Sequence, residues 1–402
     1  MMSAFPGRPL DNVRILDLSR VLAGPWCTQL MADFGADVIK VERPGAGDDT
    51  RSWGPPFVDQ GDGERVAAYF CCANRGKKSV ALDIGNPAHR DAIIELAGRV
   101  DVVVENFKTG TLERYGLGYE ALRRRNPRLV YCSITGYGKT GPYADRPGYD
   151  AVLQGVAGLM SVTGEKDGEP GAGPQKVGVP LTDILTGVYA AYGIVTALWE
   201  RERSGEGQRI DLSLLDVLVT SMATLAVPYF ASGVVPTRQG NTHASVVPSD
   251  IFACADGPIL VTVGNDAQFR KLCQALAASD LAADERYATN EGRVRHREAL
   301  VCALRELMAH RQRLPLIQAL SDAGVPAGPL NDLRQTFADP QVQHAGLTVD
   351  FPLGQGAGGQ VKVLGSPLKF SRTPAQYDRP PPGLGEHTEA VMAALSHGRE
   401  GA

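Results

Sequence analysis

Strand and helix patterns alternate through residues 13–134, and this alternation limits the fold more than any other feature of the chain. Residues 13–18 read as a strand, residues 25–34 as a helix, and residues 37–42 as the next strand. The same alternation returns over residues 79–134. Parallel strands need crossover helices of this kind between them, so the sequence predicts an α/β fold with a parallel sheet covered on both faces.

The pattern changes near Pro248. Short strand patterns over residues 250–255 and 258–263 flank Asp256-Gly257, which is a strong hairpin signal, and helical patterns follow. We therefore expect a second, smaller α+β domain. The predicted division is a large α/β domain over residues 1–213, a linker over 214–245, the small domain over 246–335, and a return segment that completes the large domain over 336–402.

Charge and cysteine content narrow the functional classes. The chain has 41 Lys and Arg against 45 Asp and Glu, which gives a net charge of −4. The sequence lacks the excess of basic residues that would predict nucleic-acid binding. The seven cysteines lack zinc-like spacing, which predicts free thiols in a reducing cytoplasm and no metal site. Residues 184–199 carry no charge but are shorter than the roughly 20 residues of a membrane span, so we expect a buried core helix.

A glycine-rich motif follows the last of the early strands. Gly136-Tyr-Gly-Lys-Thr-Gly141 fits the dinucleotide pattern G-x-G-x-x-G, which requires a helix to begin at the motif and hold a pyrophosphate. Pro142, Pro147 and Gly148 follow instead. The sequence therefore disfavours a nicotinamide-dependent enzyme.

Asp183 stands where the loop Gly178-Val-Pro-Leu-Thr meets the uncharged helix. One interpretation is an ordinary N-cap, a common role for aspartate. The other is a nucleophile: a helix N-terminus favours the ionised carboxylate, while apolar surroundings remove its water and raise its reactivity toward an activated carbonyl. With an ordinary pKa of about 3.9 it would need no general base. The local pattern leaves both interpretations open.

Several motifs occur in order along most of the chain, and together they resemble the class III CoA-transferases (the CaiB/BaiF family) from about Leu10 to about Thr388. They are Leu16-Asp-Leu-Ser-Arg-Val-Leu-Ala-Gly-Pro25, Val38-Ile-Lys-Val-Glu-Arg43, Asn74-Arg-Gly-Lys-Lys-Ser79, Val104-Glu-Asn-Phe107, Ser133-Ile-Thr-Gly-Tyr137, and the Asp183 segment with Gly205-Glu-Gly-Gln208 after it.

This resemblance implies an enzyme that moves CoA between carboxylic acids through an anhydride and then a CoA thioester on Asp183. The stretch Arg43–Phe57 looks most like the branch that uses succinyl-CoA and a dicarboxylate such as glutarate. The resemblance also implies a Rossmann-like large domain, an interlocked homodimer and no tightly bound cofactor, with CoA as a substrate. The positions implied for CoA binding are Ala23, Arg43, Lys77, Lys78, Asn106, Arg114 and Tyr137. Candidates for holding the distal carboxylate of the acid are Arg20, Arg51 and His243.

Departures from the family patterns bear on the alternatives. Racemases of the family read Gly-His-Asp where this chain has Gly148-Tyr149-Asp150, so a two-base proton relay lacks one member. Formyl-CoA transferases carry a glutamine in place of Leu22 and a run of glycines where this chain reads Gly240–Pro248. An acyl-CoA racemase and a non-catalytic CoA-binding protein remain as alternatives.

Overall fold

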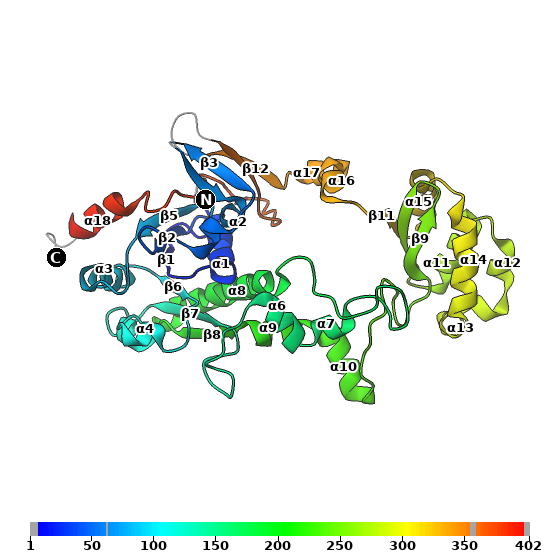
Figure 1. Cartoon of the computed structure of the whole chain (residues 1–402), viewed down its shortest axis with the longest axis horizontal. Helices are drawn as coiled ribbons and strands as arrows, with labels where there is room; N and C mark the ends of the chain where they lie inside the picture. The colour runs from blue at the N-terminus through cyan, green and yellow to red at the C-terminus, as the bar shows by residue number, and fades with distance from the viewer. Residues whose placement is uncertain (1–6, 62, 354–358, 398–402) are drawn as a thin grey trace, which may run out of the picture. The chain divides into compact units, whose positions relative to one another are not determined.

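The computed structural model describes residues 7–61, 63–353 and 359–397 (Figure 1). Contacts divide the chain into two compact units. The first consists of Met1–Leu159, Val177–Gly233 and Gly346–Ala402, and the second of Met160–Lys176 and Val234–Ala345.

A six-stranded sheet forms the centre of the first unit, in the order β5-β2-β1-β6-β7-β8. The strands are β1 (Arg14–Asp17), β2 (Asp37–Glu42), β5 (Lys77–Ala81), β6 (Val102–Glu105), β7 (Val130–Thr135) and β8 (Arg209–Ser213). Every neighbouring pair is parallel, which confirms the predicted parallel sheet. The chain builds outward from β1 to β5 and then returns to β6 on the other side of β1, so the strand order reverses between β1 and β6.

Alternate side chains of these strands enter two different cores. Ile15, Val38 and Val104 pack with helices α1 (Ala23–Ala32) and α8 (Leu181–Ser204). Leu16, Ile39 and Val103 instead pack with α3 (Pro87–Ala97) and α18 (Thr388–His397). Because successive strand residues point to opposite faces, runs of Val and Ile bury both faces of the sheet.

Helices α1 and α8 cross at Gly187, where a side chain would not fit. A Cβ on Gly187 would lie 2.8 Å from the carbonyl oxygen of Ala23 and 2.9 Å from the Trp26 ring. The missing side chain therefore lets the first turns of α8 pack against the start of α1. This crossing brings Asp183, one turn before Gly187, toward the carboxyl end of β1.

Shorter elements complete the first unit. They are η1 (Asp49–Ser52), β3 (Phe57–Gly61), β4 (Glu64–Ala67), α2 (Ala68–Cys71), α4 (Thr111–Arg114), α5 (Tyr119–Arg123), α6 (Asp150–Val156), α9 (Leu214–Ser221), α10 (Ala223–Ser232), β12 (Thr348–Pro352) and β13 (Gln360–Leu364), while α7 (Leu159–Val162) begins here and continues into the second unit. Within the stretch expected as a linker, residues 214–245, the chain forms the helices α9 and α10.

Helix α8 differs from the expected core helix, because only one of its faces is buried. Ala190 and Ile194 belong to the core, but Tyr192 is 71% and Trp199 65% exposed. By length and composition α8 passes as a membrane span, and 39% of its most apolar window is buried. A core helix of a water-soluble protein passes the same criteria, so they give little support to a span.

The second unit has its own small sheet and core. Strands β9 (Ser249–Cys254), β10 (Gly257–Thr262) and β11 (Ala327–Pro329) pair antiparallel in the order β11-β10-β9, and β9 and β10 form the hairpin expected at Asp256-Gly257. Its helices are α11 (Asp266–Ala275), α12 (Ser279–Ala283), η2 (Glu285–Tyr287), α13 (Asn290–Arg295), α14 (Arg297–Ala309), α15 (Arg313–Asp322), α16 (Leu333–Ala338) and α17 (Pro340–Ala345).

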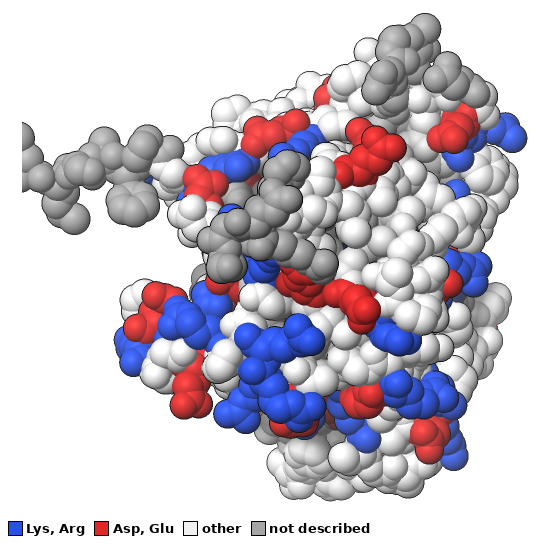
Figure 2. Space-filling model, turned by 90° about the vertical axis from the view of Figure 1, so that its left-hand side faces the viewer, with Lys and Arg blue, Asp and Glu red and all other residues white. Residues whose placement is uncertain are grey.

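Charges of both signs share the side of the molecule that lies to the left in Figure 1. Figure 2 shows Lys and Arg gathered in the lower half of that face, with Asp and Glu among them and uncharged surface between. The face therefore carries mixed charge, in keeping with the small net charge of −4.

Candidate active site

A cavity of about 220 Å³ lies at the carboxyl ends of the central strands, where the strand order reverses. Parallel α/β sheets bind ligands at such points, because loops leave the two neighbouring strands in opposite directions. The lining residues come from the segments after β1 and β6, from the end of β7 and the segment after it, from η1, and from the starts of α8 and α9. They are Arg20, Val21, Ala23, Asp49, Asn106, Phe107, Lys108, Thr109, Ile134, Thr135, Gly136, Ala144, Arg146, Pro147, Gly148, Tyr149, Asp183 and Leu214.

Asp183 enters this cavity from the first turn of α8, but not as its N-cap. The N-cap is Pro180, and Asp183 is the third helical residue. The side chain that satisfies the helix end belongs to Asp150, whose Oδ1 accepts the Thr182 N–H at 2.8 Å. The N-cap interpretation of Asp183 is therefore wrong, since another carboxylate has that role.

The environment of Asp183 changes its acidity. Burial, with a smaller contribution from the charge of Asp150, raises the pKa of Asp183 to about 7. Loss of hydration disfavours the ionised form of a buried carboxylate. The expectation of an ordinary aspartate pKa is corrected: near neutral pH, protonated and ionised forms coexist. The ionised form is a more basic, and so stronger, nucleophile than an exposed aspartate.

Three further residues expected from the sequence line the same cavity: Arg20, Ala23 and Asn106. The loops after β1 and β6 are tied together, because the Arg20 N–H donates to Asn106 Oδ1 at 2.8 Å and Asn106 Nδ2 donates to the Arg20 carbonyl at 2.7 Å. The Arg20 guanidinium is 48% exposed and lies 3.0 Å from the Asp49 carboxylate. Arg20 is thus a partly available cation at the cavity.

Among the polar lining residues of the cavity that sequence reasoning missed are Lys108, Arg146 and Tyr149. Arg146 stacks on Tyr143, with 3.8 Å between the guanidinium carbon and the ring centre. A signal for Lys108 was present, since it follows the predicted strand that ends at Glu105 and so lies at the ligand-binding edge of the sheet.

A second cavity, of about 210 Å³, adjoins the first and shares Arg20, Asp49 and Phe107 with it. It lies beyond the carboxyl ends of β1, β2 and β5, and Arg43 lines it. Arg43 is exposed. A cation in this place can meet a phosphate of a ligand that extends from the first cavity.

Arg51, expected to hold a distal carboxylate, is engaged within the protein. Its Nε and Nη2 atoms each donate to the Glu42 carboxylate at 2.7 Å, and its guanidinium carbon lies 3.8 Å from the centre of the Phe70 ring. The side chain is 9% exposed. This geometry gives Arg51 an internal ion pair rather than an open fork for a substrate.

Lys77, expected at a CoA phosphate, is wholly buried. Its ammonium donates to Asp17 Oδ2 at 3.1 Å, to the Pro25 carbonyl at 2.9 Å and to Asn74 Oδ1 at 2.9 Å. An ammonium has three donors, so none remains for a phosphate. Burial, partly offset by Asp17, lowers the pKa of Lys77 to about 8. The structure therefore corrects the CoA-binding expectation for Lys77.

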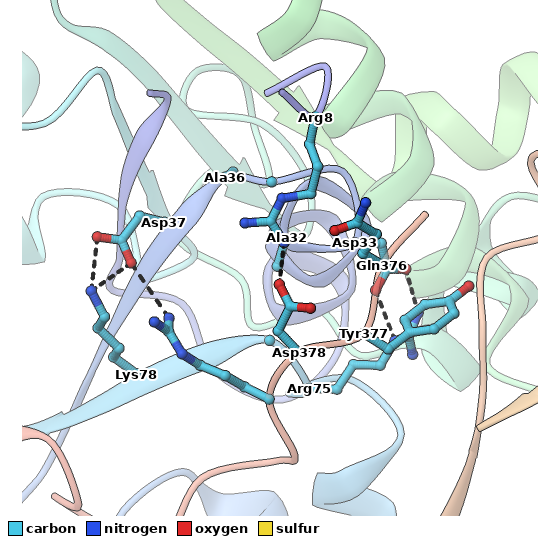
Figure 3. A pocket seen from close by; sticks show the side chains of 13 residues that line it. Arg8, Ala32, Asp33, Ala36, Asp37, Arg75, Lys78, Gln376, Tyr377 and Asp378 are labelled. Carbon is cyan, nitrogen blue, oxygen red and sulfur yellow. Dashed lines mark hydrogen bonds and ion pairs between the residues drawn. The ribbon is translucent and has the colours of Figure 1, made fainter. Parts of the chain in front are cut away.

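Lys78 points to the other edge of the sheet. It lines a separate cavity of about 260 Å³ at the amino ends of β2 and β5, where its Nζ lies 2.7 Å from Asp37 (Figure 3). The charged walls of this cavity are paired: Arg8 with Asp378, and Arg75 with Asp33. The structure thus does not bring Lys78 together with Arg43 or Asp183.

The remaining expected residues lie outside both lining sets. Arg114 is exposed at the end of α4, and Tyr137 is half-buried, with its ring centre 5.7 Å from that of Tyr143. His243 belongs to the second unit. Within residues 7–61, 63–353 and 359–397, no group of three His, Cys, Asp or Glu side chains could hold a metal ion.

Comparison with known proteins assigns the family. The family model described as CoA-transferase family III matches residues 10–388. The chain is 47% identical to the succinate–glutarate CoA-transferase of Agrobacterium fabrum, covering 98% of both chains. It is 42% identical to the human succinyl-CoA:glutarate CoA-transferase, over 96% of this chain and 85% of the human protein.

A solved structure agrees with this assignment. A CaiB/BaiF family protein from Brucella suis superposes with a TM-score of 0.86 and 46% identity, over 97% of this chain and all of that one. This similarity extends over nearly the whole chain. The protein therefore belongs to family III of the CoA-transferases, the CaiB/BaiF family, and is a CoA-transferase.

Proposed function

We propose that this enzyme transfers CoA from succinyl-CoA to a dicarboxylate such as glutarate, with Asp183 as the nucleophile. The observation that carries the proposal is the position of Asp183, a half-buried carboxylate with a raised pKa that lines the cavity at the strand reversal. The substrates of the similar enzymes from Agrobacterium fabrum and human support the choice of acids.

The first half of the reaction loads CoA onto the enzyme. An Asp183 oxygen attacks the thioester carbonyl of succinyl-CoA, the carbon–sulfur bond breaks, and a succinyl–aspartyl anhydride and the CoA thiolate form. The thiolate then attacks the aspartyl carbonyl of the anhydride. Succinate leaves, and CoA remains on Asp183 as a thioester.

The second half runs the same steps with the acceptor. A glutarate carboxylate attacks the aspartyl thioester and releases the thiolate, and the thiolate attacks the glutaryl carbonyl of the new anhydride. Glutaryl-CoA leaves and the Asp183 carboxylate is regenerated. Each step exchanges one acyl bond for another, so no oxidant, metal or further cofactor is required.

The two adjoining cavities suit the parts of such substrates. We propose that Arg43 meets a phosphate of CoA and that Arg20 meets the distal carboxylate of the acid, while Ala23 and Asn106 form the wall beside the thioester. Arg114, Tyr137 and His243 stay proposals from family resemblance. Arg51 and Lys77 are left out, because both cations are bound internally.

We also propose a homodimer, interlocked as in the family, in which the second unit is the small domain. Exposed apolar residues support this assembly, since monomers rarely expose large apolar patches. They lie on α8 and α10 and include Val188, Tyr189, Tyr192, Val195, Trp199, Val227 and Phe230. The seven free cysteines support a reducing, cytoplasmic location.

Trapping the loaded enzyme tests the central claim. The protein is incubated with succinyl-CoA and then treated with hydroxylamine or borohydride, and the modified residue is located by mass spectrometry. We expect modification at Asp183 and none in Asp183→Asn, which should still bind CoA. An unmodified Asp183 in a protein that binds CoA contradicts the mechanism.

A further inference from the structure

The turn that connects β1 to α1 has a strained backbone beside the proposed nucleophile. Val21 has φ +70°, a left-handed conformation that β-branched residues rarely adopt. Such a conformation is unfavourable and persists only where the surroundings hold it. Val21, like Arg20 and Ala23, lines the same cavity as Asp183.

The buried ion pair of Lys40 and Asp48 forms hydrogen bonds to the backbone of this turn. Both carboxylate oxygens of Asp48 lie 3.2 Å from the Val21 backbone nitrogen, whose N–H they accept. The Lys40 ammonium donates to the Ser19 carbonyl at 2.8 Å and to Asp48 Oδ2 at 2.9 Å. Neither Lys40 nor Asp48 has any exposed side-chain surface. The pair is thus hydrogen-bonded to the backbone on both sides of Arg20, at Ser19 and at Val21.

Both members of the pair are charged at neutral pH. Burial alone would raise the pKa of Asp48, but Lys40 and the hydrogen bonds from Thr50 hold it at about 2. Burial likewise opposes the charge of Lys40, and Asp48, Asp17 and Glu42 raise its pKa above the ordinary value. The contacts to the turn are therefore charge-assisted hydrogen bonds, which are stronger than neutral ones.

The pair is itself anchored to a wider buried network. The Asp48 N–H donates to Glu42 Oε2 at 2.9 Å, and Glu42 is held by both nitrogens of the Arg51 fork. Asp48 also caps η1 by accepting the Thr50 N–H at 3.0 Å. Asp48 consequently cannot shift without disturbing several fixed bonds, and this rigidity passes to the Val21 backbone.

We propose that Lys40 and Asp48 are positioning residues for CoA transfer: they hold the strained Val21 turn as a fixed wall against the acyl group reacting at Asp183. This inference rests on the proposed function, because the turn matters to catalysis only if the reaction occurs in that cavity. A misplaced wall lowers the fraction of bound substrate in an attacking geometry. The chemical step should therefore suffer more than the binding of CoA.

The test compares the wild type, Asp48→Asn, Val21→Gly and Asp48→Asn/Val21→Gly. Asp48→Asn keeps an oxygen for the Val21 N–H but removes the charge that faces Lys40. We expect kcat to fall about tenfold while the dissociation constant of CoA changes less than about threefold. Glycine adopts positive φ without strain. The double variant Asp48→Asn/Val21→Gly should therefore have a kcat at least about threefold higher than that of Asp48→Asn.

Two further variants separate positioning from stability. Asp33→Asn breaks another buried ion pair of the same unit, that with Arg75 at the opposite edge of the sheet, and should lower the melting temperature without lowering kcat. If Asp48→Asn fails to fold, Lys40→Met/Asp48→Asn leaves neither charge unpaired and should show the same loss of kcat.

The outcomes distinguish this inference from the proposed function. Suppose that the wild-type enzyme becomes labelled at Asp183. The inference alone would then be overturned if Asp48→Asn kept the wild-type kcat, if Asp33→Asn lost as much kcat as Asp48→Asn, or if Val21→Gly restored no kcat to Asp48→Asn. A wild-type enzyme that binds CoA but is never labelled at Asp183 would overturn both.

Discussion

Asp150 holds the backbone of Thr182, the residue immediately before the proposed nucleophile, through a hydrogen bond of 2.8 Å to its Oδ1. The other oxygen of Asp150 accepts from Gln154 Nε2 at 2.7 Å, and Gln154 Oε1 accepts the Val177 N–H at 2.8 Å. Asp150 and Gln154 thus anchor both ends of the loop that leads to Asp183. The charge of Asp150 also contributes to the raised pKa of Asp183, so one side chain influences both geometry and acidity.

The pH dependence of transfer should reflect this pair of carboxylates. Because the ionised form of Asp183 attacks the thioester, kcat/KM for succinyl-CoA should rise with pH through about 7 and level off above it. Asp150→Asn removes the neighbouring charge and should move the rising limb to lower pH. Gln154→Leu, which removes two hydrogen bonds but no charge, should leave the limb in place. A limb unmoved in Asp150→Asn would contradict this account.

Removing the Asp183 carboxyl charge should stabilise the fold above neutral pH. An acid whose pKa is raised on folding binds more protons in the folded state, so stability falls as pH rises from about 4 to about 7. Asp183→Asn avoids this loss. At pH 8 its free energy of unfolding, measured with urea, should exceed that of the wild type by roughly 1–3 kcal/mol. The difference from wild type should nearly disappear at pH 4. An equal difference at both pH values would rule out the raised pKa as its source.

Arg20 should discriminate dicarboxylates from monocarboxylates. With Arg20→Met, the KM for glutarate should rise about tenfold, because a charge-assisted hydrogen bond to the distal carboxylate is lost. The KM for butyrate, which lacks that group, should change little. Arg128→Met is a matched control, since Arg128 is a half-exposed cation paired with Glu202 and lies outside the described lining of both cavities. Equal losses for the two acids in Arg20→Met would count against the assignment.

The apolar face of α8 should be covered by a second copy of the chain. Tyr192→Glu together with Val195→Glu places charges on that face and should convert a dimer into monomer, as measured by sedimentation velocity. Leu368→Glu, also at an exposed apolar residue of the first unit but outside α8 and α10, should leave the association state unchanged. A wild-type chain that sediments as a monomer would refute the proposed dimer.

The central sheet could be predicted from sequence because its strands are buried on both faces. Continuous runs such as Val102-Val-Val-Glu105 carry a strong strand signal, and the ends of β1 and β2 differ by at most one residue from the expected strands over residues 13–18 and 37–42. Helix α10 was missed for the opposite reason. It contains Pro228 and has no buried residue, so its sequence lacks the periodicity that marks a helix packed against a core.

The site was predictable in its nucleophile and much less so in its cations. Asp183 lies in a motif, whereas the partners of the Lys77 and Lys78 side chains depend on the face of the sheet to which each residue points. Adjacent strand residues face opposite sides, and Lys77 reaches Asp17 while Lys78 reaches Asp37. The pairing of β5 with β2, and of β2 with β1, reveals these partners. Likewise, no local pattern connects Asp150 with Thr182.

The strand order has a consequence for when activity can arise during synthesis. Most of the cavity walls follow β1, β6 and β7, and the proposed nucleophile arrives only with α8, after all three strands. A ribosome that has released β1 to β7 has therefore made most of the walls of this cavity with no nucleophile in it. Chains that end before α8 would carry cavity walls but no nucleophile, so catalytic competence is acquired late rather than growing with chain length.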